Sequence, residues 1–592
     1  MSDTPFQQNR MAQAGSPYLR QHRDGPVWWQ EWNAAVLDYA RRNNKPLFVS
    51  VGYATCHWCH VMAQEAFANQ NIADYLNEHF VSIKVDREQR PDIDNYLMAF
   101  ITTMGEQGGW PLNAFLSPDA QPFYALTYAP VKPKFGRPGF MDILRSVNKY
   151  YKEEHLPEKT FVFSGPPAAD YESERLVGTL ENFFDRHHGG FGAGAKFPPH
   201  CTLLFMLYRH AAGPDPRLET MIRETLDPIL LGGLHDHLQG GFFRYCVDHS
   251  WQIPHFEKML YDQAMLLWSL SLANRIFQEP IYRRAALSVL TCLKETFEEN
   301  GLYVSGHDAD TDHREGATYI WPYEELQDVL DEKDFAELRK AYRISPEGNF
   351  EGKNHLVRKG RHPLPGIENK LLALRKKRKQ PFVDRKVVTS WNCLTGIALI
   401  HAGRYLEKPD ASQRALQLFE RLTDCHLING RLMHSTFEHH TQDQLFLQDY
   451  AAMLLFATFL HEETRDQEDT IRFYLGQLNE FQRDGKWIEA LTNDFIPVPA
   501  QGFDHPTPSG ISLAELSKMR GRILLGENIH PCGYAQPQAS DFYNIAGMLG
   551  DGLFHIIGSP EKLDFDTLPV NSMQIEAEEY SDCFQGSCRK TS

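Results

Sequence analysis

The chain has 592 residues, 42% hydrophobic and 12% aromatic, which is enough for several domains with large cores. It carries 77 acidic against 60 basic residues, and this net charge of −17 argues against non-specific binding to nucleic acid. The polar stretch 1–13 is not a secretory signal, and no apolar run reaches 18 residues. Ten cysteines, mostly scattered singly, indicate a reducing compartment. We therefore expect a soluble, cytoplasmic protein that binds neither nucleic acid nor membrane.

Residues 45–85 predict a strand, a helix and a second strand. The apolar run 47–51 suits a strand, residues 61–79 lack Pro and Gly and suit one helix, and residues 80–85 suit the next strand. Cys56 and Cys59 stand at the start of that helix, where the helix dipole and free N–H groups stabilise a thiolate. The C-x-x-C spacing also allows the two thiols to close a disulfide.

The segment Cys56-His57-Trp58-Cys59-His60 is also compatible with other functions. C-x-x-C-H is also the attachment pattern of c-type haem, but that requires export and no export signal is found. A Cys–His cluster can hold zinc, yet no second C-x-x-C supplies further ligands. Two buried structural cysteines fit poorly beside the polar His57 and His60. We favour a redox pair, and expect no bound metal and no cofactor.

A further strand is predicted over residues 112–116, directly after Pro111. Proline at the mouth of a strand is tolerated where it donates no ladder hydrogen bond. The position of Pro111 resembles the loop of thioredoxin-like folds in which a cis-proline faces the two cysteines. We therefore expect a cis bond between Trp110 and Pro111, with Pro111 shaping the substrate groove.

These motifs resemble the spermatogenesis-associated protein 20 family of bacteria and animals. Its members have a thioredoxin-like domain followed by a six-hairpin helical toroid. The resemblance extends over nearly the whole chain and is carried by the segments 16–22, 50–62, 81–92, 108–116, 189–198, 240–263 and 344–356. It implies a multidomain α/β plus all-α protein, with a thioredoxin-like domain followed by an (α/α)6 toroid of the six-hairpin glycosidase or epimerase kind.

Beyond about residue 170, amphipathic helices replace strands, and a glycine followed by an apolar residue recurs. These glycines stand at positions 190, 241, 301, 430 and 485. We interpret each as a helix end, because glycine adopts the left-handed conformation at low cost. Intervals of 51, 60 and 55 residues suit one helical hairpin each, and 129 suits two, or one with an insertion. An irregular α-solenoid would show the same pattern, and the family resemblance favours the closed toroid.

The densest polar segment of the helical half is 244–262. Pro254 suits a first helical turn, which would place His255, Lys258 and Asp262 on one face of a helix and Glu257 beside Tyr261. Such a set could transfer protons on a sugar, with His255 and Glu257 as base and acid. It could equally be a hydrogen-bonded plug, and both interpretations stay open.

Asp308 and Asp310 suit the paired carboxylates of glycoside chemistry, or an Asx-type turn. A calcium loop is disfavoured because acidic residues at the EF-hand spacing are missing. If the toroid holds a working site, we expect six residues to converge on one pocket: His255, Glu257, Asp308, Asp310, Trp391 and Asp449. The substrate-binding residues that we expect are Trp58, Trp110, Tyr261, Asp262, Trp391, Asn392 and Asp449.

The chain also departs from the family pattern. Arg385 and Gln448 stand where the family usually carries acids. We therefore expect the toroid to bind a ligand rather than to catalyse a reaction on it. Cys583 and Cys588 resemble the family's terminal C-x4-C. The expected domains are a tail (1–14), a thioredoxin-like domain (15–155), a linker (156–170), a toroid (171–570) and a C-terminal tail (571–592).

Three functions follow. The first is a thiol–disulfide redox protein, in which Cys56, on the more exposed side, attacks a disulfide and Cys59 resolves the intermediate. Its partners would be a protein disulfide and a small sugar-like ligand of the toroid. The second is a carbohydrate-active enzyme of the epimerase or hydrolase kind with a regulatory redox domain. The third is a non-catalytic redox sensor or scaffold.

Overall fold

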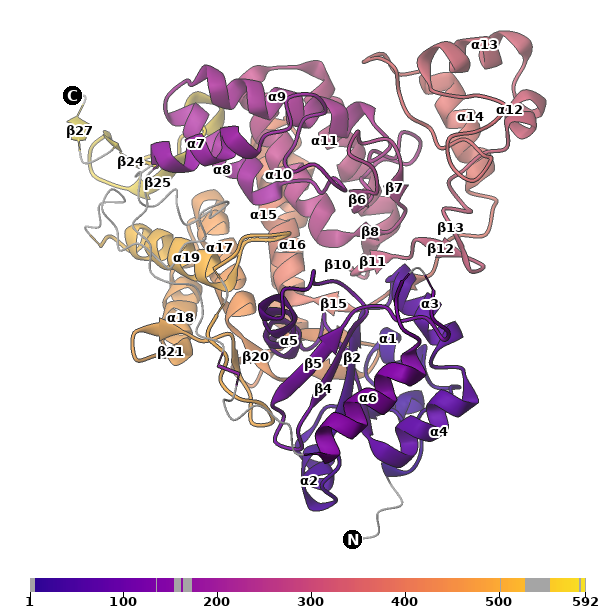
Figure 1. Cartoon of the computed structure of the whole chain (residues 1–592). Coiled ribbons are helices and arrows are strands. Elements are labelled where there is room, and N and C mark those ends of the chain that lie inside the picture. The colour runs from indigo at the N-terminus through magenta and orange to yellow at the C-terminus, as the bar shows by residue number, and fades with distance from the viewer. Residues whose placement is uncertain are drawn as a thin grey trace.

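The computed structural model describes residues 6–134, 136–153, 161–162, 173–500, 502–527, 554–584 and 587–590. A thioredoxin-like domain lies against one end of a ring of helices, and a small C-terminal sheet packs on the ring (Figure 1). The expected linker, 156–170, falls outside the described residues apart from 161 and 162. Within the described residues, no helix combines the length and the apolar character needed to cross a bilayer.

The N-terminal domain is built on a five-stranded sheet with the order β1-β3-β2-β4-β5. The strands are β1 (Gln30–Glu31), β2 (Leu47–Gly52), β3 (Val81–Asp86), β4 (Leu112–Leu116) and β5 (Pro122–Leu126). The first three are parallel, whereas β4 pairs antiparallel with β2 and with β5. Both β2 and β3 are buried along their whole length. The sequence of β2 is apolar apart from Ser50 and Gly52, whereas β3 alternates and buries the polar residues Ser82, Lys84 and Asp86.

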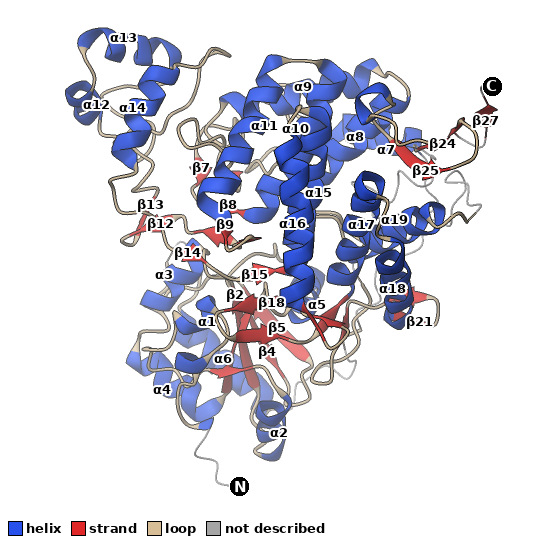
Figure 2. Cartoon of the chain, turned by 180° about the vertical axis from the view of Figure 1, so that it is seen from behind, coloured by secondary structure: helices blue, strands red, loops and turns tan. Residues whose placement is uncertain are grey.

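Helices cover both faces of this sheet (Figure 2). One face packs against α3, α4 and α6, and the other against α2 and α5. The helices are α1 (Pro17–Arg20), α2 (Ala34–Arg42), α3 (His57–Glu65), α4 (Gln70–His79), α5 (Pro91–Thr103) and α6 (Phe140–Lys152). The single helix expected over 61–79 is wrong. The chain forms α3 and α4 instead, because the Asn69 side chain accepts a hydrogen bond from the Ile72 N–H and caps a new helix.

The ring consists of helical hairpins in two layers. Its inner helices α8, α10, α15, α17 and α19 pack side by side in succession, and α9, α11, α16 and α18 lie outside them (Figures 1 and 2). The bounds are α7 (Ser173–Phe183), α8 (His200–Ala212), α9 (Pro216–Leu231), α10 (Leu260–Phe277), α11 (Pro280–Cys292), α15 (Thr389–Tyr405), α16 (Pro409–His426), α17 (Leu447–Thr464), α18 (Glu468–Leu478) and α19 (Gly510–Leu524). Inner helices are apolar nearly all round because they are buried on every side. This is the architecture of the expected (α/α)6 toroid.

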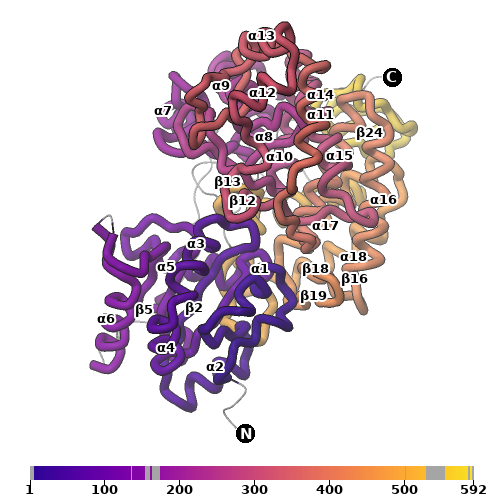
Figure 3. The backbone as a smooth tube through the Cα atoms, turned by 90° about the vertical axis from the view of Figure 1, so that its right-hand side faces the viewer, coloured from indigo at the N-terminus to yellow at the C-terminus, as the bar shows by residue number. Residues whose placement is uncertain are grey.

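An insertion accounts for the long interval of 129 residues. The helices α12 (Tyr323–Val329), α13 (Glu332–Ala341) and α14 (Pro365–Arg375) follow α11 and enclose a core of their own. They lie at the edge of the ring in Figures 1 and 3. The interval therefore contains one helical hairpin, α15/α16, and an insertion.

The recurring glycines do not end helices as predicted. Asn300-Gly301, Asn429-Gly430 and Asp484-Gly485 form two-residue turns in which both residues have positive φ. The turns join β9 (Glu298–Glu299) to β10 (Leu302–Tyr303), β16 (Leu427–Ile428) to β17 (Arg431–Leu432), and β21 (Gln482–Arg483) to β22 (Lys486–Trp487). Asn-Gly and Asp-Gly are the dipeptides that such hairpin turns require.

Short strands gather at the end of the ring that faces the thioredoxin-like domain (Figure 1). They are β6 (Tyr245–Cys246), β7 (Pro254–His255), β8 (Lys258–Met259), β11 (Gly306–His307), β12 (Asp310–Thr311), β13 (Arg314–Glu315), β14 (Val383–Asp384), β15 (Val387–Val388), β18 (Ser435–Phe437), β19 (His440–Gln442), β20 (Leu445–Phe446) and β23 (Ala490–Leu491). The helical turn expected from Pro254 is wrong. Residues 254–259 run through two strands, and α10 begins only at Leu260, because Pro254 and Lys258 pair with neighbouring strands.

The C-terminal residues expected as a tail form part of a sheet. The strands β24 (His555–Ser559), β25 (Ser572–Glu576), β26 (Ser581–Phe584) and β27 (Ser587–Lys590) pair in the order β25-β24-β26-β27. Ile557 and Met573 belong to the core of the ring. A disulfide joins Cys583 to Cys588, which are directly paired across β26 and β27.

Candidate functional site

The cysteine pair lies at the junction of β2 and α3. Cys56 is the N-cap of α3, its Sγ accepts a hydrogen bond from the Cys59 N–H (3.2 Å), and the two form a disulfide. Gly52 ends β2 directly beneath them. A Cβ at this position would lie 2.7 Å from the Cys59 Sγ, so only glycine allows the strand to come this close.

The bond between Trp110 and Pro111 is cis, as predicted. Leu112 pairs with Val51 in the register of β4 against β2, so Pro111 lies opposite Gly52, the residue beneath Cys59. The proline loop and the cysteine pair are therefore neighbours, as in a thioredoxin-like fold.

The disulfide is covered by the toroid. Cys56 is only 3% exposed and Cys59 only 1%, so the expectation that Cys56 is on the exposed side is wrong. The residues on either side of Cys56 explain the burial. Thr55 donates a hydrogen bond to the Glu257 carboxylate (2.9 Å), and the His57 Nδ1 lies 3.0 Å from the Asp310 Oδ1.

A buried ionic cluster lies behind Thr55. Arg244 donates to the Glu257 carboxylate (2.8 Å) and to the Tyr53 hydroxyl, and the His255 Nε2 lies 3.6 Å from the same carboxylate. Burial alone would raise the pKa of Glu257, but Arg244 and His255 hold that pKa below its usual value. Glu257 is therefore an ion-paired anchor between the domains rather than a free acid.

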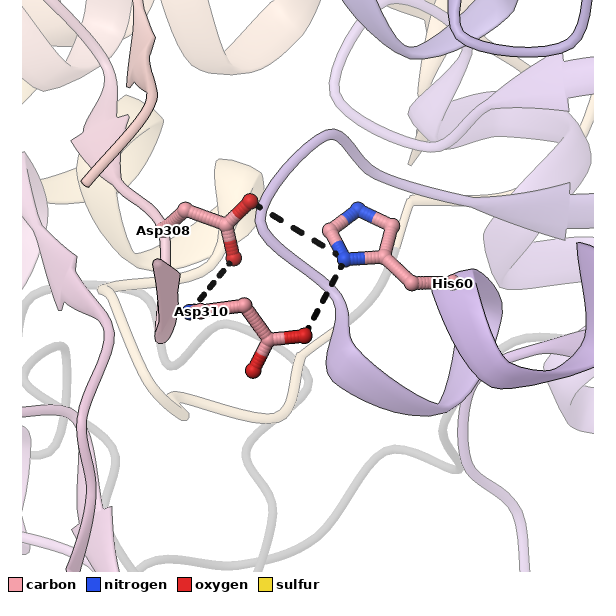
Figure 4. Close-up of side chains that lie close together, drawn as sticks. All are labelled: His60, Asp308 and Asp310. Atoms are coloured by element: carbon pink, nitrogen blue, oxygen red, sulfur yellow. Dashed lines mark hydrogen bonds and ion pairs between the residues drawn. The ribbon is translucent and has the colours of Figure 1, made fainter. Parts of the chain in front are cut away.

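A second polar cluster joins α3 to the segment between β11 and β13 (Figure 4). The His60 Nδ1 faces the Asp310 Oδ2 at 3.7 Å and the Asp308 Oδ2 at 3.9 Å. Burial raises the pKa of Asp308 to about 6. Burial would also raise the pKa of Asp310, but His57 and His60 hold it below its usual value. The hydrogen bond to Asp310 raises the pKa of His57.

A cavity of about 920 Å³ lies between the two domains. The thioredoxin-like domain contributes Arg87 and Trp110, together with residues of α5. The toroid contributes the starts of its inner helices, with His200 on α8, Tyr261 and Asp262 on α10, Ser390 and Trp391 on α15, Gln448 on α17 and Gly510 on α19. The central opening of the ring is thus closed at one end by the thioredoxin-like domain.

Several polar groups of this cavity have unused hydrogen-bonding capacity. The His200 Nε2 lies 2.8 Å from the Asp262 Oδ1, while among the described residues the Asp262 Oδ2, the His200 Nδ1 and the Tyr261 hydroxyl have no partner. Burial raises the pKa of Asp262 well above its usual value and lowers the pKa of His200 to about 3. Each of the three side chains therefore has a polar atom without a partner among the described residues, which suits hydrogen bonding to a polar ligand.

Two further contacts hold the domains together. The Lys386 ammonium, which is fully buried, pairs with Asp86 (2.8 Å), Glu88 (2.8 Å) and Asp384 (3.1 Å). The His434 Nε2 donates to the backbone oxygen of Glu88 (2.8 Å). Both link the end of β3 to the mouth of the ring.

Comparison with known proteins shows the family to which the chain belongs. The family model "Thioredox_DsbH: Protein of unknown function, DUF255" matches residues 8–160. Human spermatogenesis-associated protein 20 is 32% identical over 533 residues, which cover 77% of this chain and 68% of the human protein. The chain belongs to the spermatogenesis-associated protein 20 family. The uncharacterized protein B0495.5 of Caenorhabditis elegans is 30% identical over 593 residues, covering 87% of this chain and 80% of the worm protein. A solved D-mannose isomerase aligns with 61% of this chain and 84% of its own, with 10% identity and a TM-score of 0.40.

Within this member of the spermatogenesis-associated protein 20 family, the six residues expected to converge do not share one pocket. Only Trp391 lines the cavity. His255 and Glu257 lie in the ionic cluster, and Asp308 and Asp310 face α3. Asp449 does not line the cavity, and its carboxylate accepts a hydrogen bond from the His434 Nδ1 (2.6 Å).

The expected substrate-binding residues divide in the same way. Trp110, Tyr261 and Asp262 line the cavity. Trp58 is 51% exposed and lies against the ring of Tyr128, outside it. Asn392 bonds both backbone groups of Tyr303 and so connects α15 to β10.

Sequence reasoning missed His200 in the cavity and Lys386 at the domain boundary, and it included Arg244 only as part of the polar segment 244–262. No local pattern marks these residues, because each meets its partner only in the folded chain. For His57 and His60 a signal did exist, since their i, i+3 spacing places both on one side of α3.

Proposed function

We propose that the chain is a thiol–disulfide redox protein whose Cys56/Cys59 couple works beside a toroid cavity that binds a small sugar-like ligand. The observation that carries the redox part is the disulfide at the N-terminus of α3, opposite the cis bond of Pro111. The thioredoxin name of the family model over residues 8–160 supports it.

The redox step is ordinary thiol–disulfide exchange. In the reduced protein, the Cys56 thiolate attacks a disulfide of the substrate, forms a mixed disulfide and expels one sulfur as a thiolate, which takes up a proton. Cys59 loses its proton and attacks the Cys56 sulfur, which releases the second thiol and closes the Cys56–Cys59 bond. The substrate gains two electrons and two protons, and the protein loses them.

The test is a redox titration of the full chain in buffers of glutathione or dithiothreitol, with thiols trapped by alkylation and counted by mass. A Cys583→Ser background removes the second disulfide, and Cys393→Ser serves as control because Cys393 is a buried free thiol. A reversible two-electron transition that disappears in Cys56→Ser is expected. A disulfide that stays closed below about −300 mV would be structural, and the redox proposal would then be wrong.

The ligand part rests on the cavity. Its aromatic side chains Trp110, Tyr261 and Trp391 offer apolar faces to a sugar ring, while Arg87, Arg244 and Asp262 offer hydrogen bonds. Asp94 is ion-paired with Arg87 and Glu88 with Lys386. Asp262 is held by His200 (2.8 Å). Because these carboxylates already have partners, hydrolysis by two carboxylates is less well supported than binding.

Binding is tested by saturation-transfer NMR with a panel of aldoses, ketoses and disaccharides. We expect signals from at least one sugar class with the wild type and their loss in Trp391→Phe. They should persist in Trp487→Phe, whose tryptophan lies outside the cavity. Equal signals in both variants would show that no sugar binds in the cavity.

A further inference from the structure

The polar cluster between α3 and the segment that joins β11 to β13 points to a function of its own. We propose that three side chains from the two domains bind one divalent transition-metal ion: His60, Asp308 and Asp310. The ion would connect the first turns of α3 to the toroid. This inference is independent of the redox proposal, since it needs neither thiol.

The donor set is the first argument. One imidazole and two carboxylates, with a fourth position left for water, suit Zn²⁺, whose bonds to nitrogen and carboxylate oxygen measure about 2.0–2.2 Å. Ligand atoms of a tetrahedral ion with such bonds lie roughly 3.3–3.6 Å apart. The distances from His60 Nδ1 to Asp310 (3.7 Å) and to Asp308 (3.9 Å) are close to this separation. His57 lies beside the site and is hydrogen-bonded to Asp310 (3.0 Å). Ligand atoms of His60, Asp308 and Asp310 all lie within 4.8 Å of one another.

The orientation of His60 is the second argument. Its Nε2 lies 2.9 Å from the backbone oxygen of Ala54. A carbonyl oxygen only accepts, so Nε2 carries the proton, and in the neutral ring the lone pair is on Nδ1. Figure 4 shows Nδ1 turned toward the two carboxylates. Metal-binding histidines commonly donate their other N–H to a backbone carbonyl in this way.

The third argument is a carboxylate oxygen of Asp308 that has no donor within hydrogen-bonding distance and no Lys or Arg beside it among the described residues. The Asp308 side chain is only 7% exposed, and its Oδ1 accepts the N–H of Asp310. Its Oδ2 points at His60 from 3.9 Å, too far for a hydrogen bond, and accepts no other hydrogen bond among the described residues. Within the described part of the chain, no Lys or Arg forms an ion pair with Asp308 or Asp310. A divalent ion between these groups would neutralise both carboxylates.

The site also has a matched set of neighbours that should not bind. Asp312 and His313 lie two and three positions after Asp310 in the sequence and are exposed. Asp312 pairs with Lys379, and the His313 Nδ1 with the Gln64 amide. Their substitution changes the same surface without removing a proposed ligand.

The experiment uses the full-length, chelator-treated protein with its disulfides closed. It is titrated with Zn²⁺ by calorimetry, and with Co²⁺ as a spectroscopic probe. We expect one ion per chain, a Co²⁺ visible band without a thiolate charge-transfer band, and at least about 100-fold weaker binding in His60→Gln and Asp310→Asn. Asp312→Asn and His313→Gln should bind as the wild type does, and so should Cys56→Ser/Cys59→Ser.

Three outcomes would overturn the inference. They are no saturable binding of Zn²⁺, equal binding by Asp310→Asn and Asp312→Asn, or loss of the site in the double cysteine variant. The last outcome would assign the ion to the thiols instead. Circular dichroism of each variant shows whether a lost site reflects a lost fold.

Discussion

The Thr55 hydroxyl donates a hydrogen bond to the Glu257 carboxylate across the boundary between the two domains, at 2.9 Å. Thr55 precedes Cys56, and Glu257 belongs to the segment that leads into α10. Both groups are buried, so breaking this contact without replacing it is costly. The environment of the disulfide is therefore made by the toroid as much as by the thioredoxin-like domain.

In the reduced protein, the pKa of the Cys56 thiol should lie below the usual value of about 8.5, because Cys56 caps α3 and its sulfur lies at the positive end of the helix dipole. The measurement is the pH dependence of thiolate absorbance in Cys59→Ser, with Cys56→Ser as the reference. A pKa at or above the usual value would show that burial, which raises the pKa of a thiol, outweighs the helix dipole, which lowers it.

Lys386→Met should destabilise the protein by about 3–5 kcal/mol, because it leaves three buried carboxylates without their cation. The adjacent Arg385→Met is the matched control. Arg385 makes an exposed ion pair with Glu299, so its loss should cost less than about 1 kcal/mol. Urea denaturation measures both. Similar values for the two variants would mean that the buried cluster does not hold the domains together.

Sequence patterns could predict what is local. The strands β2 and β3 and the cysteine pair at the start of α3 depend on neighbours in the chain. The cis bond at Pro111 was predictable from the resemblance to thioredoxin-like folds. The helix predicted from Pro254 failed because pairing with other strands decides the conformation there. Asn-Gly and Asp-Gly did carry a hairpin signal, which the helix-end interpretation overlooked.

The domain boundary could not be predicted in the same way. Lys386 meets Asp86 at a separation of 300 positions, and His57 meets Asp310 at 253. Such contacts depend on how two folded surfaces meet. Paired carboxylates at 308 and 310 are equally compatible with a sugar site, a turn or a contact with another domain, and the sequence does not distinguish these environments.

Stability should fall as the pH decreases from about 6.5 to about 4. Burial lowers the pKa of His235 and of His355 to about 4 each, below the usual value near 6.5. Between these values the unfolded chain binds more protons than the folded one, so acid favours unfolding. Each histidine contributes about 1.4 kcal/mol per unit of its pKa shift.

Urea denaturation at pH 7.5 and pH 5 checks this. His355→Gln, which removes one such group, should reduce the difference between the two pH values. His439→Gln, at an exposed position, should leave the difference unchanged. A wild-type midpoint that does not move with pH would contradict the prediction.

The last prediction follows from the burial of the disulfide beneath the toroid. Because Cys56 is 3% exposed and its neighbours are held by Glu257 and Asp310, a small dithiol should reduce the disulfide far faster than a protein dithiol of equal potential. Glu257→Gln weakens the contact between the toroid and the residues around Cys56, because it removes the carboxylate charge that pairs with Arg244. We expect it to accelerate reduction by the protein dithiol at least about tenfold, equivalent to about 1.4 kcal/mol, and to change the rate with the small dithiol much less. Asp312→Asn, which lies outside this contact, should alter neither rate of reduction. If the protein dithiol reduces the wild type as fast as the small one, the toroid does not restrict access to Cys56, and a protein disulfide becomes the natural substrate.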